Sequence, residues 1–298
     1  MNDLFKRLLK KIEAQFEGLP DKPEETAQNT LKALWFKSKG CPKAVTQVEN
    51  LPLDTLTNTQ LNTLESLIQK RLEGTPLSHI TGRQEFMGIE LLADKSALIP
   101  RKETEILGRL CLSTIQEFIE KKSPIRVIDV CTGAGNLAIA FAYHVPNVDV
   151  YASDLSDEAV ALAKKNVKHT NVEKQVRLYQ GDFLEPFKTD IFLGKTDILC
   201  CNPPYISSGN VEKMHKEIHD HEPDLAFDGG PFGIKILTRL IKEAPMFLVP
   251  NGYICFEVGL GQGPAMVKRL TKSSQFQDIV TANDEQDQIR AIRARFSP

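Results

Sequence analysis

The tetrapeptide Asn202-Pro203-Pro204-Tyr205 has the residue types for one difficult reaction. An amide or arylamine nitrogen is a poor nucleophile, because its lone pair is delocalised. Two acceptors aimed at its two N–H bonds would turn that lone pair toward an electrophile. The Asn202 side-chain oxygen and the Pro203 carbonyl can be those acceptors, since the prolines fix the backbone and remove competing donors. The Tyr205 ring can stack on a flat group, so positioning and charge stabilisation would supply the catalysis without a general base.

The alternative for this tetrapeptide is a Pro-rich turn that ends a strand, with Tyr205 packed on the surface. Asn-Pro starts turns often. A double proline between Asn and Tyr, directly after the apolar strand 198–201, is much rarer than such a turn. We therefore favour the chemical interpretation.

A second cluster is the glycine turn Cys131-Thr132-Gly133-Ala134-Gly135, which follows the strand 126–130. A backbone without side chains lets a nucleotide approach closely at the carboxyl edge of a first strand. Asp154, about 20 residues further on and just after the next strand, can accept hydrogen bonds from ribose hydroxyls. Asp182 is placed to reach an adenine amino group, with Phe183 beside it as an apolar wall.

This turn has two other interpretations. Gly133-x-Gly135-x-x-Ala138 also fits the dinucleotide fingerprint, so an NAD-dependent oxidoreductase is a rival. A glycine turn can also serve only as a tight join between a strand and a helix.

From residue 106 onward, apolar strands alternate with amphipathic helices. The expected strands are 126–130, 148–152, 176–179, 198–201 and 252–258, and the expected helices are 106–120, 137–143, 157–168 and 234–245. This alternation predicts a parallel, doubly wound α/β sheet. The carboxyl ends of its strands share one edge, so the glycine turn and the tetrapeptide should meet there.

The first 75 residues read as helices. Apolar residues of 1–16 and of 61–72 recur at helical spacing, Thr57 and Gln60 have capping-box spacing, and Gly74 stands where a helix stops. Residues 76–100 suggest a hairpin. We expect a helical substrate-recognition domain over 1–75, a connector hairpin over 76–104 and a catalytic domain over 105–298.

Composition narrows the function classes. The chain has 298 residues, a net charge of −2, 41% hydrophobic and 26% charged residues, which is ordinary globular composition and gives no case for strong non-specific nucleic-acid binding. No apolar run approaches the ~18 residues of a membrane span, and residues 1–16 are not a signal peptide, which points to the cytoplasm.

The cysteines form no Cys-x-x-Cys pair and suggest reduced, buried thiols. His215, His219 and His221 with Glu222 have only loose ligand spacing, so we expect no metal.

Together these motifs resemble the HemK/PrmC family, the protein-(glutamine-N5) methyltransferases of peptide chain release factors, within the class I S-adenosylmethionine-dependent methyltransferases. The match runs from about residue 53 to residue 296. Besides Asp129-x-x-x-Gly133-x-Gly135 and the tetrapeptide, it is carried by the stretches 74–82 with Glu85-Phe86, 99–105, Glu222-Pro223 with 226–230, Phe256-Glu257-Val258-Gly259 with Gln262, and Asp284 with Arg290.

The resemblance implies a Rossmann-like class I methyltransferase sheet, S-adenosyl-L-methionine as methyl donor, S-adenosyl-L-homocysteine as product and a release factor as protein partner, with no membrane partner. Asn202, Pro203 and Tyr205 would be catalytic, and the target glutamine would enter the pocket of Asn202, Pro203, Pro204 and Tyr205. The cofactor would be lined by Asp129, Cys131, Thr132, Gly133, Ala134, Gly135, Asp154, Asp182, Phe183 and Asn202.

The sequence departs from the family pattern in three respects. Cys131 stands where the family usually has a glycine, and its side chain fits the turn if its φ is negative. Lys102 replaces the usual proline, and the first 50 residues match poorly. The tetrapeptide also occurs in adenine-N6 nucleic-acid methyltransferases, which are the alternative function. A non-catalytic, cofactor-binding partner protein is a further hypothesis.

Overall fold

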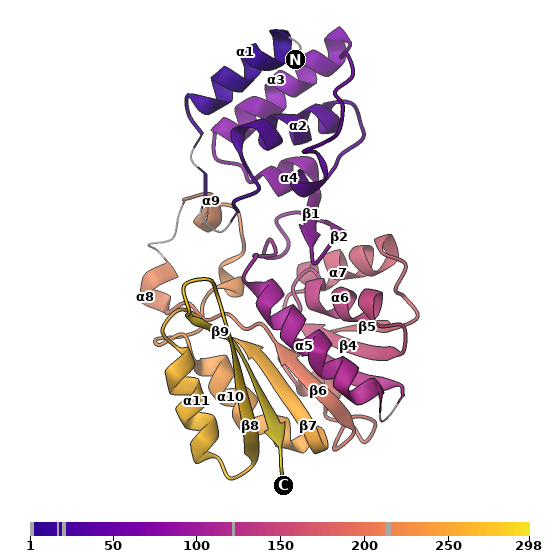
Figure 1. The fold of residues 1–298 in the computed structure, drawn as a ribbon, viewed down its shortest axis with the longest axis vertical. Helices are drawn as coiled ribbons and strands as arrows, with labels where there is room; N and C mark the ends of the chain where they lie inside the picture. Colours follow the sequence, from indigo (N-terminus) through magenta and orange to yellow (C-terminus); the bar gives the residue numbers. More distant parts are fainter. Residues whose placement is uncertain (1–2, 17, 20–21, 121–122, 212–215) are drawn as a thin grey trace.

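The computed structural model describes residues 3–16, 18–19, 22–120, 123–211 and 216–298. The N-terminal helices lie at one end of the molecule, and a short hairpin leads from them to a larger α/β part (Figure 1). Among the described residues, no helix is long and apolar enough to cross a membrane.

The N-terminal part contains α1 (Asp3–Glu13), α2 (Ala27–Ser38), α3 (Asn58–Leu72) and α4 (Leu77–Thr81). They enclose a separate apolar core around the fully buried Trp35, which packs against Phe5. The predicted capping box is confirmed, since Thr57 Oγ1 accepts from Gln60 N and Gln60 Oε1 accepts from Thr57 N. Within the described residues, α1 ends at Glu13 rather than at residue 16.

The connector contains the predicted hairpin, with β1 (Arg83–Phe86) paired antiparallel to β2 (Ile89–Leu92). Asn166 fixes the end of this hairpin, because its side chain accepts from Leu92 N at 2.7 Å and donates to Leu92 O at 3.1 Å. Asn166 belongs to α7 (Asp157–His169), so the hairpin is anchored to the α/β part.

A sheet of seven strands in the order β5-β4-β3-β6-β7-β9-β8 forms the centre of the α/β part. The strands are β3 (Ile125–Val130), β4 (Val148–Asp154), β5 (Val176–Gln180), β6 (Thr196–Cys201), β7 (Leu248–Glu257), β8 (Phe276–Asn283) and β9 (Ile289–Phe296). Pairs from β5 to β7 are parallel, as predicted, whereas β9 runs antiparallel to both of its neighbours. The strand order reverses beside β3, which makes the gap between β3 and β6 the topological switch point.

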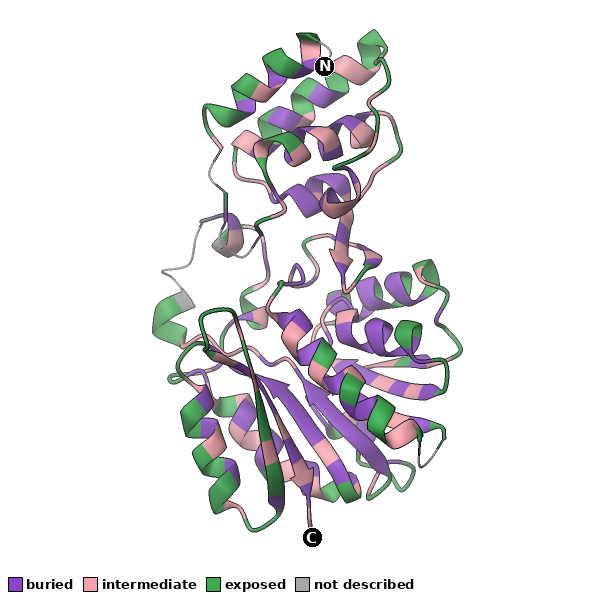
Figure 2. Cartoon of the chain, in the orientation of Figure 1, coloured by how far each residue is buried: buried purple, intermediate pink, exposed green. Residues whose placement is uncertain are grey.

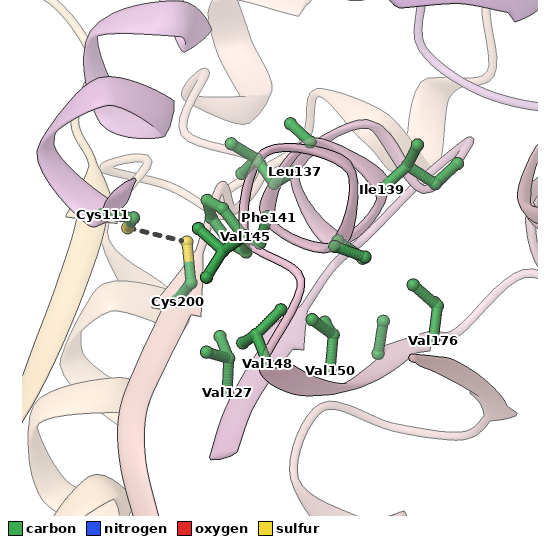
Figure 3. Close-up of a cluster of buried hydrophobic side chains, with 14 of the residues drawn as sticks. Cys111, Val127, Leu137, Ile139, Phe141, Val145, Val148, Val150, Val176 and Cys200 are labelled. Atoms are coloured by element: carbon green, nitrogen blue, oxygen red, sulfur yellow. Dashed lines mark hydrogen bonds between the residues drawn. The ribbon is translucent and has the colours of Figure 1, made fainter. Parts of the chain in front are cut away.

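Helices cover both faces of this sheet, so its central strands are buried on both sides (Figures 1 and 2). Apolar residues of α5 (Thr104–Ile119) and α6 (Asn136–His144) share one core cluster with Val127, and the buried thiols of Cys111 and Cys200 meet there at 3.5 Å (Figure 3). Apolar residues of α10 (Lys235–Glu243) and α11 (Gly263–Lys272) share the other cluster with Ile128. The remaining short helices are α8 (Ser208–Val211), α9 (Lys216–His219) and 3-10 turns at 45–47, 185–187, 224–226 and 244–246.

One sequence expectation about side-chain exposure was wrong, because Cys41 is exposed and Cys131 half-buried, so the thiols are not uniformly buried. Arg290 of β9 is a buried cation, with Glu103 and Asp284 each at 3.8 Å from its guanidinium. The carboxylates of two other segments compensate its charge, which the local pattern of β9 cannot reveal.

A buried ion cluster joins the N-terminal part to the loop that follows β6. Glu217 of α9 accepts from Lys22 at 3.1 Å and from Arg71 at 2.7 Å, and Arg71 also pairs with Glu25 at 3.3 Å. Burial acts to raise the pKa of Glu217, but Lys22 and Arg71 outweigh it and hold that pKa below the usual value. The loop therefore has a charged attachment to helices far from it in sequence.

Candidate active site

The tetrapeptide Asn202–Tyr205 directly follows β6, and the glycine turn directly follows β3, its parallel neighbour. Both therefore lie at the switch point, as the sequence predicted. A cavity of about 430 Å³ opens there. That volume is typical of small-molecule sites. Its lining brings together most of the predicted cofactor residues: Cys131, Thr132, Gly133, Asp154, Asp182, Phe183 and Asn202.

The glycine turn presents bare backbone to this cavity. Gly133 has a φ of +56°, and a Cβ at this position would meet no atom within 4 Å. Asp154 holds the turn, because its Oδ2 accepts from Gly133 N at 2.8 Å while Oδ1 accepts from Ser156 N at 3.0 Å. The open space beside Gly133 and the carboxylate at the end of β4 suit a ligand with hydroxyl donors.

Cys131 takes a φ of +60°, so the condition of a negative φ is not met. The turn keeps the left-handed conformation that favours glycine, which costs a cysteine about 1–2 kcal/mol. Cys131 still lines the cavity, so its thiol forms part of the wall beside Thr132 and Gly133.

Three of the predicted cofactor residues form the framework behind the wall. Asp129 is fully buried and accepts from Thr132 Oγ1 at 2.6 Å. Burial raises the pKa of Asp129 to about 7, against the opposing effect of the bond from Thr132. Ala134 and Gly135 are buried at the start of α6, where a Cβ on Gly135 would press on Ile139 and Ala163 at 3.2–3.3 Å.

Asp182 and Phe183 share a partner that the sequence did not indicate. Arg239 of α10 donates to both carboxylate oxygens of Asp182 at 2.8 Å, and its guanidinium lies 4.9 Å from the Phe183 ring centroid. All three line the cavity. The wall thus combines an apolar ring with a fixed carboxylate, and Arg239 joins it from a helix more than fifty positions away.

Asn136, the first residue of α6, is a second lining residue that the sequence interpretation missed. Its Oδ1 is buried without a hydrogen-bond partner among the described residues. A buried acceptor without a donor is costly. This atom is therefore suited to receive a donor from a bound ligand.

A smaller cavity of about 140 Å³ lies next to the larger one. It is lined by Pro203 and Tyr205, together with Phe227 of the loop after β6. Asn202 lines both cavities, as do Leu98 and Ala226, so its side chain stands where a nucleotide-sized space meets a side-chain-sized one.

The orientation of the Asn202 amide is fixed by α5. Its Nδ2 donates to Thr104 Oγ1 at 3.2 Å, so a substrate –NH₂ group would meet Oδ1. This orientation is compatible with the acceptor role predicted for Asn202, which stays a prediction. Thr104, the first residue of α5, belongs to the stretch 99–105 that carries the resemblance, but nothing in that stretch indicates a contact with Asn202.

The backbone at Tyr205 is held by Gln262, which donates from Nε2 to Tyr205 O at 2.9 Å and accepts from Gly259 N. A Cβ on Gly259 would lie 2.9 Å from the Tyr205 ring, and one on Gly233 would lie 2.0 Å from Tyr205 O. These two glycines are therefore required by close approach, and they place the ring.

Arg101 and Glu103 both line the smaller cavity. Arg101 donates to Glu222 at 2.5 Å, and Glu222 also accepts from Ile99 N. His215 lies outside the described residues. In the part of the chain that the structure describes, no group of three metal-ligating side chains is present.

Comparisons with known proteins agree with this geometry. The model of the "Methyltransferase small domain" family matches residues 108–230. The release factor glutamine methyltransferase of Thermodesulfovibrio yellowstonii is 33% identical over 234 residues, covering 77% of this chain and 79% of that protein. The enzyme of the same name from Bacillus subtilis is 32% identical over 228 residues, covering 76% of this chain and 77% of that protein.

Solved structures show the same fold. The human methyltransferase 10 domain containing protein aligns with a TM-score of 0.50 at 18% identity, covering 70% of this chain and 88% of its own. The hMettl16 catalytic domain aligns with a TM-score of 0.51 at 15% identity, covering 78% of this chain and 91% of its own. The sheet is thus the Rossmann-like class I methyltransferase sheet that the sequence predicted. On its sequence relatives, the chain belongs to the family of release factor glutamine methyltransferases.

Proposed function

We propose that this protein transfers a methyl group from S-adenosyl-L-methionine to the side-chain amide nitrogen (N5) of a glutamine, in the Gly-Gly-Gln loop of a peptide chain release factor. The observation that carries this proposal is that Asn202 lines both cavities. The larger cavity has room for the donor, and the smaller one has room for a glutamine side chain.

The residues of the larger cavity fit this methyl donor. Asp154 would accept from the ribose hydroxyls and the open backbone at Gly133 would admit the nucleoside. Phe183 and Asp182 would flank the adenine, and the unpartnered Oδ1 of Asn136 would accept from a ligand ammonium group. When bound, the donor supplies an electrophilic methyl carbon on a sulfonium.

The residues of the smaller cavity would prepare the nucleophile. Asn202 Oδ1 and the Pro203 carbonyl accept the two amide N–H bonds, which turns the nitrogen lone pair toward the larger cavity. The Tyr205 ring stacks on the amide plane. As the N–CH₃ bond forms, the S–CH₃ bond breaks and its electron pair stays on sulfur; the amide nitrogen releases one proton to water. Asn202 and Pro203 stabilise the positive charge on nitrogen until that proton leaves.

We further propose that residues 1–75 and the connector 76–104 hold the release factor while residues 105–298 perform the transfer. Glu217 supports this division of labour, since it links the N-terminal ion cluster to the loop whose residues 225–226 and 228–230 line the larger cavity.

The direct test is incubation with radiolabelled S-adenosyl-L-methionine and a release factor. We expect label on the Gly-Gly-Gln glutamine, and none on a release factor in which that glutamine is replaced by alanine. An oligonucleotide arm separates the adenine-N6 alternative, because label on DNA or RNA and not on protein would refute the proposal.

Replacing Asp154 with alanine is expected to weaken binding of S-adenosylhomocysteine by about 10- to 100-fold, since hydrogen bonds to a charged group contribute roughly 1.5–3 kcal/mol. The variant also loses the acceptor of Gly133 N, which loosens the turn. Isothermal titration calorimetry measures the Kd. Asp157→Ala, an exposed residue of the neighbouring helix, is the control and should bind normally. Equal Kd values for the two variants would remove Asp154 from the cofactor site.

A further inference from the structure

Glu257, the last residue of β7, is a buried carboxylate beside the proposed catalytic residues. The hydroxyls of Thr104 and Tyr205 both face it. Neither Glu257 oxygen has a full hydrogen bond among the described residues, so these contacts are looser than ideal. Polar contacts in active sites are often long without ligands and tighten in the reacting complex.

Two proposed catalytic side chains thus converge on one carboxylate from different elements. Asn202 reaches Glu257 through the Thr104 hydroxyl, with a 3.2 Å hydrogen bond from Nδ2 to Oγ1, and Tyr205 reaches it directly. Thr104 is 3% exposed and Glu257 is 1% exposed, so water would not compete when these contacts tighten into hydrogen bonds.

The direction of the hydrogen bonds depends on the charge of Glu257. An ionised carboxylate only accepts, so the Thr104 hydroxyl must donate to it. The Thr104 oxygen then accepts from Asn202 Nδ2, which leaves Oδ1 toward the substrate. A neutral group at 257 that donates to Thr104 would let the threonine proton turn to Asn202, and the amide could then present Nδ2 to the substrate. An Asn202 –NH₂ group that faces the substrate –NH₂ group offers it no hydrogen-bond acceptor and cannot hold it.

We propose that Glu257 is a positioning residue for methyl transfer, which acts through Thr104 to keep the Asn202 oxygen toward the substrate amide and acts directly to seat the Tyr205 ring. The proposal rests on the proposed function of Asn202, and adds to it the group that sets the polarity of the site.

The charges around Glu257 make this polarity depend on pH. Burial raises the pKa of Glu257 to about 7, although Thr104, Tyr205 and the guanidinium of Arg290 oppose the increase; Glu103 adds to it. Asp284 lies on the far side of Arg290 at 3.8 Å. Protonation of Glu257 near neutral pH would reverse the direction of the hydrogen bonds that run through Thr104 to Asn202. The kcat should therefore fall as the pH decreases through about 7.

The test uses the full-length protein and a release factor in the label-transfer assay. Glu257→Gln keeps the volume but removes the charge and adds an N–H donor where the carboxylate only accepts, and we expect kcat to fall by about 10²-fold, the loss typical of a displaced catalytic group. The Kd for S-adenosylhomocysteine should stay at the wild-type value. The rise of kcat with pH near 7 that we expect for the wild type should be absent in Glu257→Gln.

Thr104 supplies variants that do not alter the buried charge. Thr104→Val should lower kcat, whereas Thr104→Ser, which keeps the hydroxyl, should retain it. The double variant Thr104→Val with Glu257→Gln should show a smaller decrease in kcat than the product of the two single decreases, because both residues act on Asn202 through the same hydrogen bonds. Glu117→Gln, at an exposed position of α5, is the matched control and should behave as wild type.

Normal kcat in Glu257→Gln, or an unchanged pH profile in a folded Glu257→Gln that binds S-adenosylhomocysteine, would overturn the positioning role. So would multiplicative losses in the double variant. A wild-type protein that transfers no label would instead refute the proposed function itself, so the two failures are distinguishable.

Discussion

Replacing Asn202 with alanine is expected to lower kcat by about 10²–10³-fold, which corresponds to roughly 2.7–4 kcal/mol of lost barrier stabilisation. The alanine removes the acceptor Oδ1 that faces the substrate side and leaves the Thr104 hydroxyl without its donor. Because Asn202 contributes only part of the wall of the larger cavity, the Kd for S-adenosylhomocysteine should rise much less than kcat falls. Label transfer to a release factor measures kcat, and calorimetry measures Kd.

Asn147→Ala is the matched control for this variant. Asn147 is an exposed asparagine that precedes β4, at the opposite edge of the sheet from the site. It should retain wild-type kcat and Kd. If Asn202→Ala weakened cofactor binding strongly while turnover at saturation persisted, Asn202 would be a cofactor ligand and not the group that orients the nucleophile.

Replacing Arg71 with methionine is expected to destabilise the N-terminal part by about 3–5 kcal/mol, the cost of removing one partner from a buried ion pair. Glu25 would lose its 3.3 Å ion pair and Glu217 its 2.7 Å ion pair, in a site where these side chains are 3–8% exposed. The chain has one tryptophan, Trp35, and it lies in the core of these helices, so its fluorescence reports their unfolding in urea.

Arg109→Met is the control for that measurement. Arg109 makes an ion pair of 2.9 Å with Glu105, but its side chain is 60% exposed. Exposed pairs contribute only about 0–1 kcal/mol, so the urea midpoint should scarcely move. Equal shifts for the two methionine variants would show that the buried cluster is no more important than a surface pair.

Much of the fold could be predicted from local patterns. Apolar runs at 198–201 and 252–258 predicted buried strands, and Thr57 with Gln60 predicted the start of a helix that the structure confirms. These signals lie within a few residues of the feature they specify. The antiparallel β9 could not be predicted from its own alternation, because strand direction depends on the path of the whole chain.

The site divides in the same way. The turn after β3 and the tetrapeptide after β6 could be placed at one edge, because parallel strands end together. Thr104 could not be identified, since it lies 98 positions from Asn202, and Arg239 lies 57 positions from Asp182. Glu257 could be noted as part of a motif, but its meaning depends on the hydroxyls of Thr104 and Tyr205, which two other segments bring to it. The dinucleotide interpretation of Gly133 and Gly135 was a real ambiguity, since the turn itself is shared; family membership resolves it toward methyl transfer.

The attachment at Glu217 has a mechanical consequence. The N-terminal helices are tied to the α/β part at two separate places, by the covalent chain at the hairpin and by the ion cluster at α9. A rigid body held at two points keeps one rotational freedom, about the line that joins them. Any rotation of the helices would therefore turn about an axis that passes through the loop lining both cavities. A release factor that binds to the N-terminal helices would thus act mechanically on the residues around the two cavities.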